Sequence, residues 1–141
     1  MSSHALQTVA TIVPTFRYRD APAAIAFLCR AFGFEQMLVV PGEDGSIVHA
    51  QLRFGNGMIM LASATESDFG RMVGLPELGN TGGQGPYVIV ADCDGHYARA
   101  KEAGAAILLD IEDKEYGGRG YSCRDPEGYI WSFGSYDPWA S

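Results

Sequence analysis

The chain has 141 residues, the size of one domain, and a globule of this size buries roughly 70% of its unfolded surface. No stretch reaches the roughly 18 apolar residues of a membrane-spanning helix, so we expect no span and no membrane partner. The formal net charge of −7 argues against nucleic acid and anionic membranes as partners, because both attract basic surfaces.

Two features of the sequence, the N-terminus and the cysteines, indicate the cellular compartment. The first residues carry no basic stretch followed by a long apolar one, so they do not resemble a secretory signal. Cys29, Cys93 and Cys123 are odd in number, lack Cys-x-x-Cys spacing and fall within expected helices and strands. We therefore predict reduced core thiols and a cytoplasmic protein.

The first half of the chain has the order strand, helix, strand, strand, strand. Residues 11–18 alternate strand-forming side chains, and Asp20 followed by Pro22 is typical of a helix start. The helix should end at Gly33. Three strands are predicted after it, with a Pro-Gly turn between the first two and an Asn-Gly hairpin between the last two; their sequences are FEQMLVVP, IVHAQLRF and MIMLASA.

The second half repeats this order after a glycine-rich stretch. Asp20 corresponds to Asp92, a shift of 72, and the turn at 54–57 corresponds to residues 125–128, a shift of 71. A single deletion in the second helix reconciles the two shifts. The predicted parts are a first repeat at about 11–63, a linker at 64–84 and a second repeat at about 85–136.

These repeats define the fold class. Neither repeat has enough apolar surface to form a core alone, so we predict a single α+β domain, residues 1–141, in which two βαβββ repeats combine. Each repeat contributes a four-stranded mixed sheet with its helix on the outside. The other faces of the paired sheets then surround a central cavity.

The order of elements and three segments carry a family resemblance. The segments are YRDAPAAIAFLCRAFGFE, DCDGHYARAKEAGA and RDPEGYIWSFGS. They resemble the vicinal-oxygen-chelate superfamily, which includes glyoxalase I, extradiol dioxygenases, and the fosfomycin and bleomycin resistance proteins. The resemblance covers about Thr11 to Tyr136; it implies the cavity, a small-molecule ligand and a homodimer, and it does not select one reaction.

The resemblance also implies where a metal would bind. Metal-dependent members take ligands from the first and last strands of each half, and these positions here are Val13, Leu61, Gly85 and Ser132. Valine, leucine and glycine side chains donate nothing and serine is a poor ligand for a divalent ion. We therefore expect no cofactor. A divalent metal at a displaced site, built from His49 with Glu115 or Glu127, stays an alternative.

Polar side chains alternate with apolar ones along the strands, and we place them on the cavity side. The predicted ligand-binding residues on the strands are Thr15, Arg17, His49, Gln51, Arg53, Ser122, Arg124 and Ser132. Guanidinium groups suit carboxylates and phosphates, so they favour a polar or anionic ligand. The alternative is that the arginines are solvated or paired at the rim.

Aromatic residues of the second half fall into two groups. Tyr116 and Arg119, in the loop EYGGRG, are predicted at the cavity mouth, where glycines permit loop motion. Tyr129, Trp131 and Phe133 are predicted to face the helix. The alternative is that Tyr129 and Trp131 help to enclose an organic ligand. His96, on the second helix, is expected to be exposed.

The function predicted from these features is binding of a small polar or anionic organic molecule without metal. His49 is the candidate catalyst of a rival reading, a metal-free acid-base enzyme, although no orienting acid stands beside it. A second rival is a lyase or dioxygenase with relocated metal ligands. A third is an interaction module that uses the linker and the tail SYDPWAS.

Overall fold

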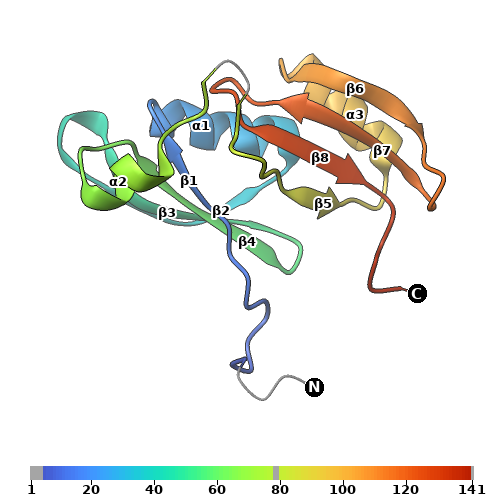
Figure 1. The fold of residues 1–141 in the computed structure, drawn as a ribbon, viewed down its shortest axis with the longest axis horizontal. Coiled ribbons are helices and arrows are strands. Elements are labelled where there is room, and N and C mark those ends of the chain that lie inside the picture. The colour runs from blue at the N-terminus through green and yellow to red at the C-terminus, as the bar shows by residue number, and fades with distance from the viewer. Residues whose placement is uncertain (1–4, 78–79, 141) are drawn as a thin grey trace.

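The computed structural model describes residues 5–77 and 80–140. Its strands form two four-stranded sheets, ordered β1-β4-β3-β2 and β5-β8-β7-β6 (Figure 1). In each sheet the first strand runs parallel to the last, and the remaining pairs are antiparallel. This is the predicted α+β arrangement of two βαβββ repeats.

The elements have the following bounds. The first repeat consists of β1 (Thr15–Tyr18), α1 (Ala21–Phe27), the π-helical turn η1 (Leu28–Phe32), β2 (Glu35–Pro41), the short 3-10 turn η2 (Glu43–Gly45), β3 (Ile47–Phe54) and β4 (Gly57–Ser63). The linker contains α2 (Asp68–Val73), which we did not predict. The second repeat consists of β5 (Tyr87–Ile89), α3 (Cys93–Glu102), β6 (Ala106–Asp113), β7 (Arg119–Arg124) and β8 (Ile130–Gly134).

The helices begin and end where the sequence predicts. The carboxylates of Asp20 and Asp92 accept bonds from the N–H groups of Ala23 and Gly95, at 3.2 and 3.0 Å, and so cap α1 and α3. Gly33 closes η1 with a φ of 88°, a backbone conformation that favours glycine. Helices α1 and α3 lie behind the sheets, whereas α2 lies in front of the first sheet (Figure 1).

The register of the sheets corrects one step of the repeat alignment. Met60 lies opposite Thr15, and Ser132 lies opposite Tyr87, so the last strands are related by a shift of 72 and not 71. The extra residue sits in the second hairpin turn. The residue equivalent to Ser132 is therefore Met60, and the Leu61 side chain is buried in the core.

Aromatic side chains from both repeats share one core. The ring of Phe16 stacks on Trp131 with centroids 5.0 Å apart, and the ring of Phe32 lies 4.7 Å from that of Phe133. Trp131 and Phe133 have no exposed surface, which confirms that they pack beneath the helices. The two sheets are therefore joined through their helix-facing sides.

His96 belongs to this junction, and the prediction that it is exposed was wrong. Its Nε2 lies 2.8 Å from the carbonyl oxygen of Phe32, and its Nδ1 lies 2.6 Å from the hydroxyl of Tyr121. A carbonyl can only accept, so Nε2 carries the proton and Nδ1 accepts from Tyr121. Burial is the main cause that lowers the pKa of His96.

The second hairpin turn fastens one repeat to the other. The Asp125 side chain is buried and accepts bonds from the Tyr18 hydroxyl at 2.7 Å and from Trp131 Nε1 at 3.1 Å. The Glu127 carboxylate accepts bonds from two main-chain N–H groups, those of residues 19 and 20, at 2.6 and 2.7 Å. The turn therefore holds the start of α1.

The structure also shows the state of the cysteines and the character of the helices. All three cysteines are free, and Cys93 and Cys123 are buried, as predicted for core thiols. Within residues 5–77 and 80–140, none of the helices has the length and apolarity needed to cross a membrane.

Candidate functional site

A cleft of about 820 Å³ opens where the two repeats meet. Its walls come from the start of β1, from α2 and its end, and from the glycine-rich segment before β5. The lining residues are Pro14, Thr15, Phe16, Phe69, Met72, Val73, Gly74, Thr81, Gly82, Gly83, Gln84, Gly85, Pro86 and Tyr129. We call it the inter-repeat cleft.

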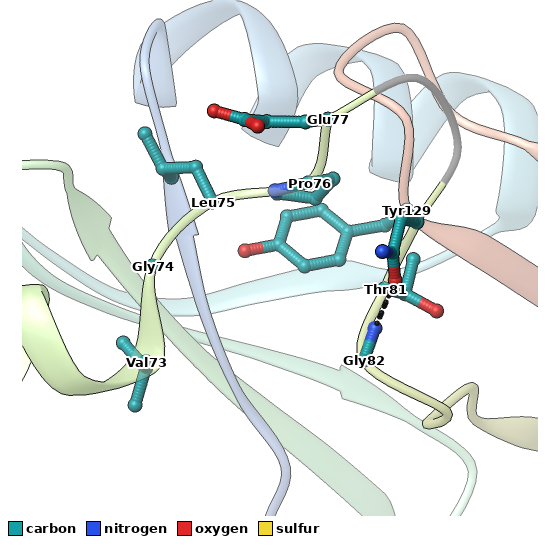
Figure 2. A pocket seen from close by; sticks show the side chains of 9 residues that line it. Val73, Gly74, Leu75, Pro76, Glu77, Thr81, Gly82 and Tyr129 are labelled. Carbon is teal, nitrogen blue, oxygen red and sulfur yellow. Dashed lines mark hydrogen bonds between the residues drawn. The ribbon is translucent and has the colours of Figure 1, made fainter.

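A smaller hollow of about 260 Å³ adjoins this cleft, since both are lined by Val73, Gly74 and Tyr129. Figure 2 shows the Tyr129 ring beside Pro76, with its hydroxyl directed away from Thr81. The ring therefore forms a wall of both hollows.

The Tyr129 hydroxyl caps the free edge of β1. The carbonyls of Pro14 and Tyr18 accept bonds from the β4 side, so the peptide groups of Thr15 and Arg17 face the opposite edge. There the Tyr129 hydroxyl donates to the Arg17 carbonyl at 2.8 Å and accepts from the Arg17 N–H at 3.2 Å. The peptide group of Thr15 is left facing the inter-repeat cleft.

The Arg17 side chain binds the linker. Its Nη2 donates to the Thr65 carbonyl at 2.7 Å, and its Nη1 donates to the carbonyls of Gly70 and Gly74, each at 3.2 Å. A Cβ at position 70 would come within 2.5 Å of Arg17 Nη2, which explains the glycine there. One guanidinium thus holds residues before, within and after α2 against the first sheet.

His49 and Gln51 form a pair on the first sheet. His49 Nε2 lies 2.9 Å from Gln51 Oε1, so this nitrogen donates and Nδ1 remains the acceptor. Their cross-strand neighbours are apolar, with Val40 opposite His49, and Leu38 opposite Gln51. In the described part of the chain, Gln51 is the side chain that His49 binds, and no carboxylate joins the pair.

The second sheet carries a matching polar pair. The hydroxyls of Ser122 and Ser132 lie 2.7 Å apart. Tyr87 stands on the other side of Ser132, and Leu109 on the other side of Ser122. Both sheets therefore present neutral hydrogen-bonding groups between apolar side chains.

The remaining predicted arginines differ in their surroundings. Arg119 forms ion pairs with Asp113 at 2.8 Å and with Asp94 at 3.2 Å. Arg53 donates to a neighbouring main-chain carbonyl at 3.0 Å. The Nε of Arg124 is buried and has no hydrogen-bond partner among residues 5–77 and 80–140. None of these three arginines belongs to the lining of the inter-repeat cleft.

Of the predicted ligand-binding residues, Thr15 lines the inter-repeat cleft and Tyr116 lines a separate hollow. The other predicted residues belong to neither lining. Tyr129, which we predicted to face the helix, lines the cleft instead. The structure also adds the apolar face of α2, which includes Phe69 and Met72, as a wall that sequence reasoning missed. A signal for α2 existed, because the Ser67 hydroxyl accepts from the Gly70 N–H at 2.9 Å as an N-cap does.

The chemistry of the cleft follows from its lining. Among the described lining residues there is no carboxylate, histidine, cysteine, lysine or arginine. The one phenol, Tyr129, has its pKa raised, mainly by burial, and its hydroxyl is bound to β1. The walls can hold an organic molecule by apolar contact and neutral hydrogen bonds, and they offer no general acid or base near neutral pH.

The positions that the resemblance assigns to a metal do not fit one. With the corrected register they are Val13, Met60, Gly85 and Ser132, and the only hydroxyl among them is bound to Ser122. Elsewhere in the described ranges, no three side chains of His, Cys, Asp or Glu come together as a metal site would require.

Sequence comparisons relate the chain to one superfamily. The model of the Glyoxalase/Bleomycin resistance protein/Dioxygenase superfamily matches residues 7–133. The uncharacterized proteins Mb0911c of Mycobacterium bovis and Rv0887c of Mycobacterium tuberculosis are each 36% identical to the chain over 119 residues. These matches cover 82% of the chain, 76% of Mb0911c and 68% of Rv0887c.

Solved structures with the same arrangement support this relationship. TioX from Micromonospora sp. ML1 is 34% identical, with a TM-score of 0.70 over 87% of this chain and 95% of TioX. The fosfomycin resistance protein FosX from Mesorhizobium loti has a TM-score of 0.64 over 92% of this chain and 93% of FosX. At 12% identity, the likeness to FosX shows the fold alone.

Proposed function

The chain belongs to the Glyoxalase/Bleomycin resistance protein/Dioxygenase superfamily, and within it we propose that this protein binds a small organic molecule in the inter-repeat cleft without metal and without catalysis there. The observation that carries the proposal is the lining of the cleft, whose described residues include no acid-base side chain other than the bound phenol of Tyr129. The volume of about 820 Å³ is in the range of small-molecule sites.

The apolar part of such a ligand would contact α2. Phe69, Met72 and Val73 line the cleft and are 54%, 78% and 53% exposed, so their side chains have apolar surface to bury. Each Å² of apolar surface removed from water contributes about 25 cal/mol. This wall favours a ligand with a sizeable apolar body.

The polar part of the ligand would meet neutral groups. Thr15, whose peptide group faces away from β4, and Gln84 belong to the cleft lining. Arg17 and Arg119, which the sequence suggested for an anion, bind main-chain carbonyls and carboxylates instead. We therefore favour a neutral polar ligand, because no arginine belongs to the described lining of the cleft.

A second copy of the chain belongs to the same proposal. Leu38 and Val40 on β2, and Leu109 on β6, are 44%, 38% and 60% exposed, and both strands are sheet edges. Burial of these side chains in a homodimer would remove apolar surface from water. Light scattering after size exclusion tests the dimer, and a monomer at micromolar concentration contradicts it.

A cytoplasmic location, which suits the three free thiols, is also proposed.

The experiment is a fluorescence titration with Nile red, a neutral apolar dye that brightens when it leaves water. Met72→Glu places a carboxylate on the cleft wall and should weaken dye binding about tenfold, because the bound dye would bury that charge. Val48→Glu is the matched control, since Val48 is 61% exposed and lies outside the cleft lining. Equal affinities of the two variants would remove the cleft from the proposal.

A further inference from the structure

A second hollow, of about 370 Å³, lies where the C-terminal tail leaves the second sheet. It is lined by Tyr87, Tyr116, Tyr136 and Pro138, and we call it the aromatic hollow. We propose that the aromatic hollow binds an organic cation, in particular a methylated ammonium group, through cation–π contacts. None of its lining residues belongs to the inter-repeat cleft, so this proposal goes beyond the proposed function.

The tyrosine rings form the walls of a corner. The rings of Tyr116 and Tyr136 meet at an interplanar angle of 76°, with centroids 4.8 Å apart. Two faces set nearly at right angles can contact one compact cation from two sides, and Tyr87 adds a third aromatic wall. The negative face of each ring attracts positive charge.

The position of Tyr87 is fixed before any ligand binds. Its hydroxyl donates to the Tyr136 carbonyl at 2.6 Å, which ties β5 to the tail. A Cβ on Gly134 would lie 2.7 Å from the Tyr87 hydroxyl oxygen and 3.0 Å from its Cε1. Glycine at that position therefore makes room for the ring to lie across β8.

The charges around the hollow also favour a cation. Asp137 lies in the sequence between two lining residues, Tyr136 and Pro138, and so brings a carboxylate beside the hollow. The nearby Arg119 is neutralised by two carboxylates. The whole chain carries a formal charge of −7, which attracts cations over longer distances.

The lining explains why the ammonium should be methylated. Its side chains are three phenol rings and one proline, and the Tyr87 hydroxyl is already bound. Two phenol hydroxyls, those of Tyr116 and Tyr136, are the side-chain acceptors left in this lining, fewer than the three N–H groups of a primary ammonium would need in place of water. N-methyl groups need no acceptor and contact ring faces directly.

The test is an NMR titration of the amide spectrum of the full chain with choline. We expect shifts at Gly117 and Gly118, which adjoin Tyr136, and a dissociation constant on the order of 10 mM. The uncharged isostere 3,3-dimethylbutan-1-ol should shift these amides far less, because it keeps the shape of choline and lacks its charge.

Three variants locate the site. Tyr116→Leu should weaken choline binding about threefold or more, and Tyr116→Phe should retain it, since phenylalanine keeps the ring. Tyr116 is 62% exposed, so neither change disturbs the core. Phe69→Leu, at an exposed ring of the inter-repeat cleft, should leave choline binding unchanged.

Four results would overturn the proposal. Equal binding of the neutral isostere would exclude cation recognition, and undiminished binding by Tyr116→Leu would place the site elsewhere. Loss of choline binding in Phe69→Leu would assign the effect to the inter-repeat cleft. An unshifted spectrum at choline concentrations about tenfold above the expected dissociation constant would exclude the site.

Discussion

The hydrogen bonds of Asp125, Glu127 and His96 join the two repeats, and we call this region the seam. The seam and the inter-repeat cleft use ionisable groups in opposite ways. At the seam, Asp125, Glu127 and His96 each form a hydrogen bond with a group of the other repeat. In the described lining of the cleft, the one ionisable side chain is the bound Tyr129. The raised pKa of Asp125 and the lowered pKa of His96, both caused mainly by burial, therefore accompany a structural role, whereas shifted values in many enzymes mark the catalytic site.

Asp125 offers the strongest way to break the seam. Asp125→Ala should lower the free energy of unfolding by about 3 kcal/mol, because the Tyr18 hydroxyl and Trp131 Nε1 would stay buried without an acceptor. Urea denaturation measures the change. Asn56→Ala, in the equivalent turn of the first repeat, is the control and should cost well under half as much. A similar loss in both variants would contradict the special role of the second turn.

The bonds between Arg17 and the linker provide a second test, because they hold α2, one wall of the cleft, against the first sheet. Arg17→Ala removes the three bonds that hold the linker, so a protease should cut residues 64–77 about tenfold faster. Arg53→Ala, which removes a local contact to a neighbouring carbonyl, is the matched control. If both variants are cut at the wild-type rate, the guanidinium does not anchor α2.

His96 gives a smaller effect that appears with pH. Its folded-state pKa is lowered from the ordinary value of 6.5, so the unfolded chain binds a proton first as the pH falls. Stability contributed by neutral His96 is therefore complete above about pH 6.5 and is lost below it. The loss should be smaller than that caused by Asp125→Ala.

Unfolding measured across this pH window in the wild type and in His96→Gln isolates the contribution of His96. The variant lacks the titrating ring, so its stability should fall less between pH 7 and pH 5, a window of about two units around the ordinary pKa. The same slope in both proteins would show that other groups control the acid dependence.

Much of the fold could be predicted because it rests on local and repeated patterns. Alternating strands, the Asp20 and Asp92 caps and the duplicated order of elements all act within a few residues or recur at a fixed shift. The six-residue helix α2 escaped prediction because a short helix carries little apolar periodicity. Its cap at Ser67 was the available signal.

The site was harder to predict because its long side chains form hydrogen bonds with residues far away in the sequence. Arg17 lies on the expected face, yet its guanidinium reaches carbonyls 48 to 57 residues away in the sequence. Tyr129 lies directly before β8, yet its hydroxyl binds the edge of β1, 112 residues away. Strand alternation predicts the face of a side chain and does not predict which group its end will meet.

The central claim is that the inter-repeat cleft binds a neutral molecule without the help of an ionisable group or a metal. Nile red affinity tests it most directly when measured from about pH 6 to about pH 9, with and without EDTA, since His and Cys side chains titrate in this range. The account predicts one affinity, constant within about twofold, under all these conditions. A tenfold change with pH, or its loss on chelation, would contradict the claim.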